Sequence, residues 1–194
     1  PSIISHVAVA VASDVAFAPR SVPSHFWSLS IICSVIPDLD GIGFFFGIPY
    51  NHVFGHRGFF HSPLFGLLLS VFLVSVFFRN LETFSKQWFF YIVFFFLLSS
   101  SHGILDAFTN GGLGVALLSP FDKMRYFFRW RPIMVSPIGI EPFFSQWGLA
   151  VIKSELLWVW LPSFLMVVIA MFLEDFCNFN DRTQKQILLV KDQG

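Results

Sequence analysis

Charged residues are scarce in this chain of 194 residues. Asp, Glu, Lys and Arg make up 12% of the sequence, about half the share found in a typical soluble domain. Twelve acidic and twelve basic side chains cannot cover the surface of a water-soluble globule of this size. Disorder is excluded as well, because 55% of the residues are hydrophobic and 28 are Phe. The composition therefore indicates an integral membrane protein.

The chain also lacks a net charge and has few cysteines. A net charge of zero implies no nucleic-acid partner. The two cysteines, Cys33 and Cys177, do not have the spacing of a metal site. We expect them to be thiols in apolar surroundings.

Apolar runs, by contrast, are long. A membrane-spanning helix needs about 20 mostly apolar residues. Three windows contain no Asp, Glu, Lys or Arg, namely 58–78, 87–105 and 156–173. Two weaker windows, 3–18 and 26–36, predict a helical hairpin that turns at 19–23, and Pro37 is expected to end its second helix. We therefore expect an all-α integral membrane bundle of four to five helices.

The remaining segments predict one membrane domain, 1–173, and a polar C-terminal tail, 174–194. Residues 41–58 are expected to form an interfacial loop, and 107–147 a segment on the membrane surface. That segment carries a basic cluster made of Lys123, Arg125, Arg129 and Arg131. Such a cluster suits either a lipid phosphate or an anchor at the membrane interface.

Ionisable side chains beside apolar windows are informative, because each costs at least ~2.5–3.5 kcal/mol in lipid and normally pairs or binds an ion. His102 and Asp106 are four residues apart at the end of an uncharged window, which places both on one helix face. That spacing suits two ligands of one divalent metal. A hydrogen-bonded pair that caps the helix is the structural alternative.

Two further clusters lie near other segment ends. Asp38 and Asp40 follow Pro37 and are predicted to be metal ligands or a general base, with a simple turn as the alternative. His56 and His61 are predicted metal ligands, because imidazole is a common ligand of metals in proteins.

Single residues complete the candidate site. Arg57 is predicted to hold an oxygen of a phosphate or carboxylate group. His6 lies on a narrow stripe of small and polar residues along the first helix and is a further candidate ligand. Asp14 lies on the same stripe and is either a partner of that site or one half of a buried pair.

The predicted topology brings these clusters to one membrane face, because each pair of crossings returns the chain to the side on which His6 lies. The predicted metal ligands are His6, Asp38, Asp40, His56, His61, His102 and Asp106. The predicted catalytic residues are Asp38, Asp40 and Arg57. A ligand set of His and Asp without Cys indicates zinc, with manganese or iron as alternatives. Such sites activate water or polarise a phosphoryl or acyl oxygen.

Several motifs resemble the YdjM-type family of bacterial, membrane-bound, metal-dependent hydrolases. They lie at 34–40, 46–50, 55–62, 102–116 and 130–139. The resemblance covers about residues 1 to 165 and implies an inner-membrane location and a metal site built from the His and Asp positions above. One departure is Phe60, where the family usually has Thr.

A looser similarity is to zinc-dependent phospholipase C and nuclease enzymes. It implies that Asp38 or Asp40 joins His61, His102 and Asp106 in one metal site, and that His6 with Asp106 completes a second. It also implies hydrolysis of a phosphoester. The later His-x-x-x-Glu element of those enzymes is missing, because no His follows His102.

The predicted function is therefore hydrolysis, in the inner membrane, of a phosphoester or other ester in a lipid or lipid-linked substrate. Metal-activated water would be the nucleophile. The main alternative is a non-catalytic metal-ion transporter or carrier that uses the same buried ligands. A haem protein with two axial histidines is disfavoured, because the histidines cluster beside carboxylates at helix ends. Phe60 leaves an inactive scaffold as a third alternative.

Overall fold

The chain is all-helical over the residues that the computed structural model describes, 1–19 and 21–191, as the composition predicts. Between the helices, this part contains two isolated β-bridges and no named strand. In chain order the helices are α1 (Ile3–Phe17), α2 (Ser24–Val35), η1 (Ile36–Phe46), η2 (Phe59–His61), α3 (Pro63–Phe77), α4 (Lys86–Ala107), α5 (Ile140–Phe143), α6 (Gln146–Glu155), η3 (Leu156–Trp160) and α7 (Leu161–Lys191).

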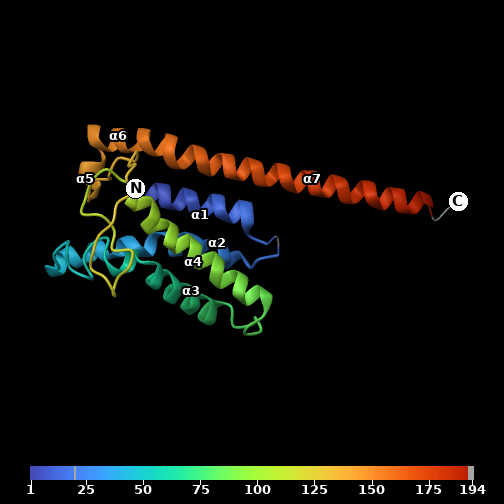
Figure 1. Cartoon of the computed structure of the whole chain (residues 1–194), viewed down its shortest axis with the longest axis horizontal. Helices are drawn as coiled ribbons and strands as arrows, with labels where there is room; N and C mark the ends of the chain where they lie inside the picture. The colour runs from blue at the N-terminus through green and yellow to red at the C-terminus, as the bar shows by residue number, and fades with distance from the viewer. Residues whose placement is uncertain (20, 192–194) are drawn as a thin grey trace.

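Helices α1 to α4 pack into a bundle, and α7 runs beside α1 and continues well beyond it (Figure 1). The short helices η1, η2, α5 and α6 and the long connections gather at one end of the bundle. The N-terminus and the C-terminal end of α4 lie at that same end. The loops at 36–62 and 108–145 therefore surround the end of α4 that carries His102 and Asp106.

Three helical segments are long and apolar enough to cross a membrane. They are Ser24–Phe46, Lys86–Ala107 and Gln146–Phe176, and two shorter apolar helices, Ile3–Phe17 and Pro63–Phe77, accompany them. Only 6% of the most apolar window of the last segment is buried within the chain. Most of this segment is therefore left for lipid to cover.

Two predicted boundaries need adjustment. The second helix ends at Val35, close to the predicted end at Pro37, but the chain does not leave the helical conformation there, because Pro37 stands in the first turn of η1, where a missing N–H costs little. The chain instead continues as a 3₁₀ helix to Phe46, so the first part of the predicted loop at 41–58 is helical. The last span also begins ten residues before the predicted window 156–173.

The predicted tail, 174–194, is more polar than the rest of the chain, but its described backbone is helical like that of the span before it. Helix α7 continues through most of 174–194 and is described as far as Lys191. Residues 192–194, the side chain of Cys177 and residue Arg20 in the predicted turn lie outside the described residues.

Serine caps fix where two helices of the bundle begin. The Ser62 hydroxyl accepts a hydrogen bond from the Phe65 N–H, and Pro63 occupies the first turn of α3. In the same way, Ser85 accepts a hydrogen bond from the Trp88 N–H at the start of α4. The cap at Ser62 directly follows His61, so the same turn that starts α3 also sets the position of this histidine.

Aromatic packing holds the bundle together. Phe26 of α2 is fully buried and meets the rings of Tyr91 and Phe95 of α4 at centroid distances of 4.9 and 5.0 Å. Phe78, which follows α3, also packs on Tyr91, at a centroid distance of 4.8 Å. Cys33 is buried in this cluster with its thiol directed at the Phe95 carbonyl, in the apolar surroundings expected of it.

A buried carboxylate joins α1 to the start of the last span. The carboxylate of Glu155, at the end of α6, accepts hydrogen bonds from the N–H and hydroxyl of Ser2 and from the hydroxyl of Ser5. A carboxylate from another helix thus provides the acceptor for polar groups at the N-terminal end of α1, where negative charge is favourable. A π-helical turn, η3, follows at once, and the Trp160 indole at its end donates to Ser5.

Replacing Glu155 by Ala should lower the free energy of unfolding by about 1–3 kcal/mol, because buried donors of Ser2 and Ser5 lose their acceptor. Chemical denaturation in detergent, followed by circular dichroism, measures this. Glu155→Gln keeps one acceptor oxygen and should lose less. Equal stability of Glu155→Ala and wild type would show that this network does not hold α1.

Candidate metal centre

Four side chains from three helices bring candidate ligand atoms together inside the loop end of the bundle. They are Asp38 of η1, His61 of η2, and His102 and Asp106 of α4, and one ligand atom of each lies within 4.8 Å of all the others. His102 Nε2 lies 3.2 Å from His61 Nε2 and 3.3 Å from Asp38 Oδ1. His61 Nε2 lies 3.4 Å from Asp106 Oδ2 and 3.6 Å from Asp38 Oδ1.

These distances fit a tetrahedral cation site. Zinc binds His nitrogen and carboxylate oxygen at about 2.0–2.2 Å, so ligand atoms at the corners of a tetrahedron lie about 3.3–3.6 Å apart. Four of the six separations between the ligand atoms run from 3.2 to 3.6 Å. The donor set, two imidazoles and two carboxylates, also suits zinc, manganese or iron. The residues present therefore fit a divalent metal.

The other ring nitrogens of the two histidines have partners of their own. His102 Nδ1 lies 2.7 Å from the Ser34 carbonyl oxygen, which accepts only if Nδ1 carries the proton. His61 Nδ1 lies 3.0 Å from Asp40 Oδ2. Partners of this kind fix the tautomer of a metal-binding histidine and turn the lone pair of Nε2 toward the ion. Two such lone pairs at 3.2 Å require a proton or a metal cation between them.

Asp38 and Asp40 thus lie next to different ring nitrogens of His61. A 3₁₀ helix has three residues per turn, so side chains two residues apart point in directions about 120° apart. Asp38 faces His61 Nε2, whereas Asp40 faces Nδ1. Asp40 also accepts from the Arg57 N–H and contacts His56 Nδ1 at 2.7 Å. The sequence alone left Asp38 and Asp40 as equivalent candidates.

The carboxylates also govern the protonation of His61. Burial alone would lower its pKa, but Asp106, Asp38 and Asp40 outweigh that effect and raise the pKa of His61 well above its ordinary value. Metal ligands must be deprotonated, so a divalent metal that binds here competes with a proton for His61.

Arg57 connects the two sides of this cluster. Its backbone N–H donates to Asp40, its Nε lies 3.0 Å from Asp106 Oδ2, and its NH1 donates to Thr109 Oγ1 and to the Gly111 carbonyl. Its φ of 61° is in the left-handed region, which a residue other than Gly seldom adopts and which clusters at functional sites. Arg57 thus holds the turn before η2 against the C-terminal end of α4.

His6 lies next to the four-residue group but outside it. Its ring stacks on the ring of His102 at a centroid distance of 3.5 Å, and its Nε2 lies 3.8 Å from Asp106 Oδ1. The Pro1 nitrogen lies 2.5 Å from that same oxygen. Asp106 therefore turns Oδ1 toward α1 and Oδ2 toward His61. Asp14 is remote from this group and accepts a hydrogen bond from Ser30 within the bundle.

His56 belongs to a second possible ligand group with Asp40 and His61. That group shares His61, which offers Nδ1 to it and Nε2 to the first group. The His56 Nδ1 contact with Asp40 leaves the second ring nitrogen of His56 for other partners, and His56 lines a cavity. Its assignment as a metal ligand stays a prediction.

Two glycines that sequence reasoning missed allow the close approach of these elements. A Cβ on Gly103 would lie 2.3 Å from the His61 carbonyl oxygen, so η2 can rest on α4 only because residue 103 is Gly. Gly112 has a φ of 85°, and a Cβ there would press on the Tyr50 hydroxyl and the Arg57 guanidinium. A Gly directly after His102 in an otherwise apolar helix was the available signal.

The predicted basic cluster is divided by the fold. Arg125 is partly buried and donates hydrogen bonds to the carbonyls of Tyr50, His56 and Gly114, which fastens the loop at 50–57 to the segment after α4. Lys123, Arg129 and Arg131 are exposed. Arg125 is thus committed to loop carbonyls, and the exposed members are the ones available to a lipid phosphate.

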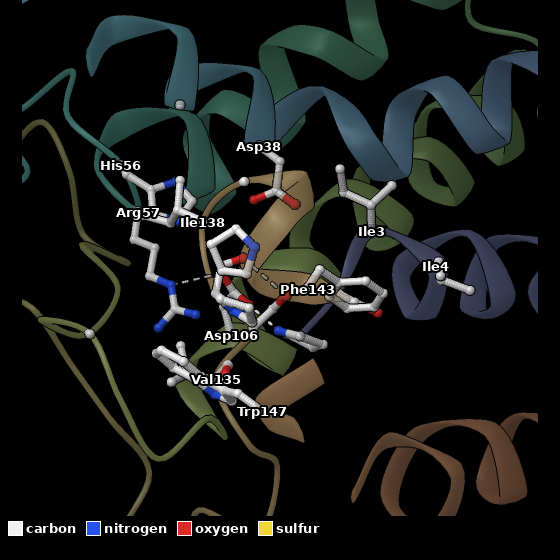
Figure 2. A pocket seen from close by; sticks show the side chains of 18 of the residues that line it. Ile3, Ile4, Asp38, His56, Arg57, Asp106, Val135, Ile138, Phe143 and Trp147 are labelled. Atoms are coloured by element: carbon white, nitrogen blue, oxygen red, sulfur yellow. Dashed lines mark hydrogen bonds and ion pairs between the residues drawn. The ribbon is translucent and has the colours of Figure 1, made fainter. Parts of the chain in front are cut away.

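A cavity of about 740 Å³ reaches the candidate metal centre from outside. Asp38, His56, Arg57 and Asp106 line its polar end, with Val135, Trp147 and Phe143 along its other sides (Figure 2). A cavity of this volume is in the range that holds one small ligand. The candidate metal centre is therefore accessible from outside through this cavity.

Comparison with known proteins places the chain in a family. The YdjM inner membrane protein family matches residues 2–176. The inner membrane protein YbcI of Escherichia coli (strain K12) is 37% identical over 170 residues, which is 86% of this chain and 95% of that protein. No solved structure gives a significant match. The chain belongs to the YdjM inner membrane protein family and is an inner-membrane protein.

Replacing His102 or Asp106 by Ala should reduce zinc affinity by more than about 100-fold, because direct ligands cost more than their hydrogen-bonding partners. Elemental analysis of protein purified in detergent and equilibrium dialysis against zinc measure this. The matched control is His52→Ala, which removes an exposed histidine outside the cluster. Wild type without stoichiometric metal, or variants with as much metal as wild type, would contradict the assignment.

Replacing Asp40 by Asn should weaken zinc binding by about 10–100-fold without abolishing it, because Asp40 orients His61 rather than facing the other three groups. Dialysis at several zinc concentrations separates this partial loss from the complete loss expected of Asp38→Asn. If the loss in Asp40→Asn matched that in the direct-ligand variants, Asp40 would itself be a ligand.

Proposed function

We propose that this member of the YdjM inner membrane protein family is a metal-dependent hydrolase that cleaves a phosphoester or other ester bond in a lipid or lipid-linked substrate. One observation carries the proposal. A buried group of two histidines and two aspartates stands at the inner end of a cavity whose other walls are apolar, in a protein that spans the membrane. The looser similarity to zinc-dependent phospholipase C enzymes points to the same chemistry.

The metal would be held by Asp38, His61, His102 and Asp106. A divalent cation, most simply zinc, supplies Lewis-acid chemistry that acidifies water and polarises a phosphoryl or acyl oxygen. Four protein ligands at the corners of a tetrahedron leave no open position, so catalysis would need a fifth position, to which catalytic zinc can expand. Asp38 and Asp106 both border the cavity, and Asp38 is the more exposed of the two, with 16% of its side chain exposed, so it marks the side from which substrate would enter.

His56 is placed to accept a proton on the cavity side. Its Nδ1 contacts Asp40 Oδ1 at 2.7 Å, and a proton donated there leaves Nε2 with a free lone pair. A carboxylate that holds an imidazole in one tautomer is the arrangement by which a histidine becomes a general base. Asp40, whose side chain is fully buried, orients His56 and does not itself reach the cavity.

Arg57 pairs with the carboxylate of Asp106 and is placed to bind an oxygen of the substrate. Its Nε pairs with Asp106, and its NH1 is held by Thr109 and the Gly111 carbonyl, so the guanidinium cannot swing away. It lines the cavity, as Asp38 and Asp106 do, and is directed at Asp106 (Figure 2). A fixed guanidinium at this place binds an oxygen of a phosphate or an ester carbonyl.

The proposal predicts that zinc-loaded protein in lipid nanodiscs releases a product from a bacterial inner-membrane lipid extract, and that His102→Ala does not. Mass spectrometry of the lipid and aqueous fractions detects the product without prior choice of substrate. A chain that binds stoichiometric zinc yet changes no lipid, and that transports zinc across liposomes, would contradict hydrolysis and support a metal-ion carrier.

A second variant tests the role of His56. His56→Gln should lower kcat by about 10²–10⁴-fold, because general-base catalysis contributes that much. Zinc content should stay at the wild-type level. Loss of zinc in His56→Gln would instead identify His56 as a metal ligand, as the sequence predicts.

A further inference from the structure

One wall of the cavity is apolar and comes from a segment that the proposed chemistry does not use. Residues 135–147, with α5 at their centre, face the N-terminal end of α1 across the cavity. The apolar side chains that line it here are Ile3, Ile4, Val135, Ile138, Phe143 and Trp147 (Figure 2). The charged side chains of Asp38, Arg57 and Asp106 line the same cavity, so it has both a charged region and an apolar wall.

Hydrogen bonds fix this wall in place. The Val135 N–H donates to Asn110 Oδ1, and the Val135 carbonyl accepts from the Trp147 indole N–H, both at 3.0 Å. The Met134 N–H donates to Ser154 of α6. The wall is therefore tied both to the segment that follows Asp106 and to the last span, and it is a preformed surface.

The mouth of the cavity is as apolar as the wall. Ile138 is 60% exposed and Phe144 is 84% exposed, and Ile3 and Ile4 are about half exposed on an apolar helix of the membrane bundle. Exposed apolar groups of this kind are stable in contact with lipid but unfavourable in contact with water. We therefore infer that the opening between α1 and α5 points to the side of the helical bundle, toward the lipid of the bilayer.

We propose that the apolar wall of the cavity binds the acyl chain of the substrate, which enters from the bilayer between α1 and α5. The ester bond next to that chain then lies in the charged region. This rests on the proposed function for the ester, but binding of the chain does not need hydrolysis. Ile138 and Phe143 line the path of the chain and determine which chain lengths fit.

Non-hydrolysable alkyl phosphonates of increasing length test the proposal on zinc-loaded protein in nanodiscs, since detergent would itself fill the cavity. Isothermal titration, corrected with empty nanodiscs, should give a dissociation constant that falls about fourfold for each added methylene until the cavity is full. Ile138→Trp should abolish this gain but leave methylphosphonate binding unchanged. Phe121→Ala, which alters an 86% exposed side chain outside the cavity, should behave as wild type.

A photolabel gives a readout that needs neither zinc nor phosphonate affinity. A single-chain lipid phosphate with a diazirine in its acyl chain should label residues 135–147, and Ile138→Trp should remove that label. Labels restricted to the outer face of α7, or chain-length gains that are equal in Ile138→Trp and wild type, would overturn the proposal. Chain binding without any lipid product would leave the acyl site in place and reject hydrolysis.

Discussion

Two imidazole nitrogens face each other 3.2 Å apart inside a membrane protein, and much of the loop end of the molecule serves to hold them there. The Ser34 carbonyl and Asp40 hold the far side of each ring, so both free lone pairs point inward. Such an arrangement is unfavourable unless a cation stands between them. The carboxylates of Asp38 and Asp106 border the same space. The surrounding structure is therefore arranged to hold a positive charge there.

That constraint explains features that otherwise look unrelated. Gly103 lets η2 rest on α4, and the cap at Ser62 starts α3 directly after His61. Arg57 adopts a left-handed backbone conformation while its N–H and guanidinium engage Asp40 and Asp106. Glu155 fastens the N-terminus of α1, the helix whose His6 stacks on His102. Each contact limits how far the candidate ligands can move apart, which is what a preorganised metal site requires.

The helices and the meeting of the clusters could be predicted, because both follow from apolar length and from the i, i+4 spacing of His102 and Asp106. The division of labour between Asp38 and Asp40 could not. It depends on the 3₁₀ geometry of η1, which runs past Pro37 where the sequence indicated an end. Contacts between distant segments could not be predicted either, because no local sequence pattern links Glu155 to Ser2 or Val135 to Asn110. The general-base role proposed for His56 likewise needs the folded turn that brings its Nδ1 to Asp40, whereas the oxygen-binding role of Arg57 is predicted from the sequence.

The most direct test of the account is X-ray absorption spectroscopy at the zinc edge of the purified, zinc-loaded protein. The account predicts a first shell of nitrogen and oxygen at about 2.0–2.1 Å, with the outer-shell scattering of two imidazoles and no sulfur. His61→Ala and His102→Ala should each remove one imidazole contribution. A first shell without imidazole, or with sulfur at about 2.3 Å, would contradict the claim that His61 and His102 share one metal ion.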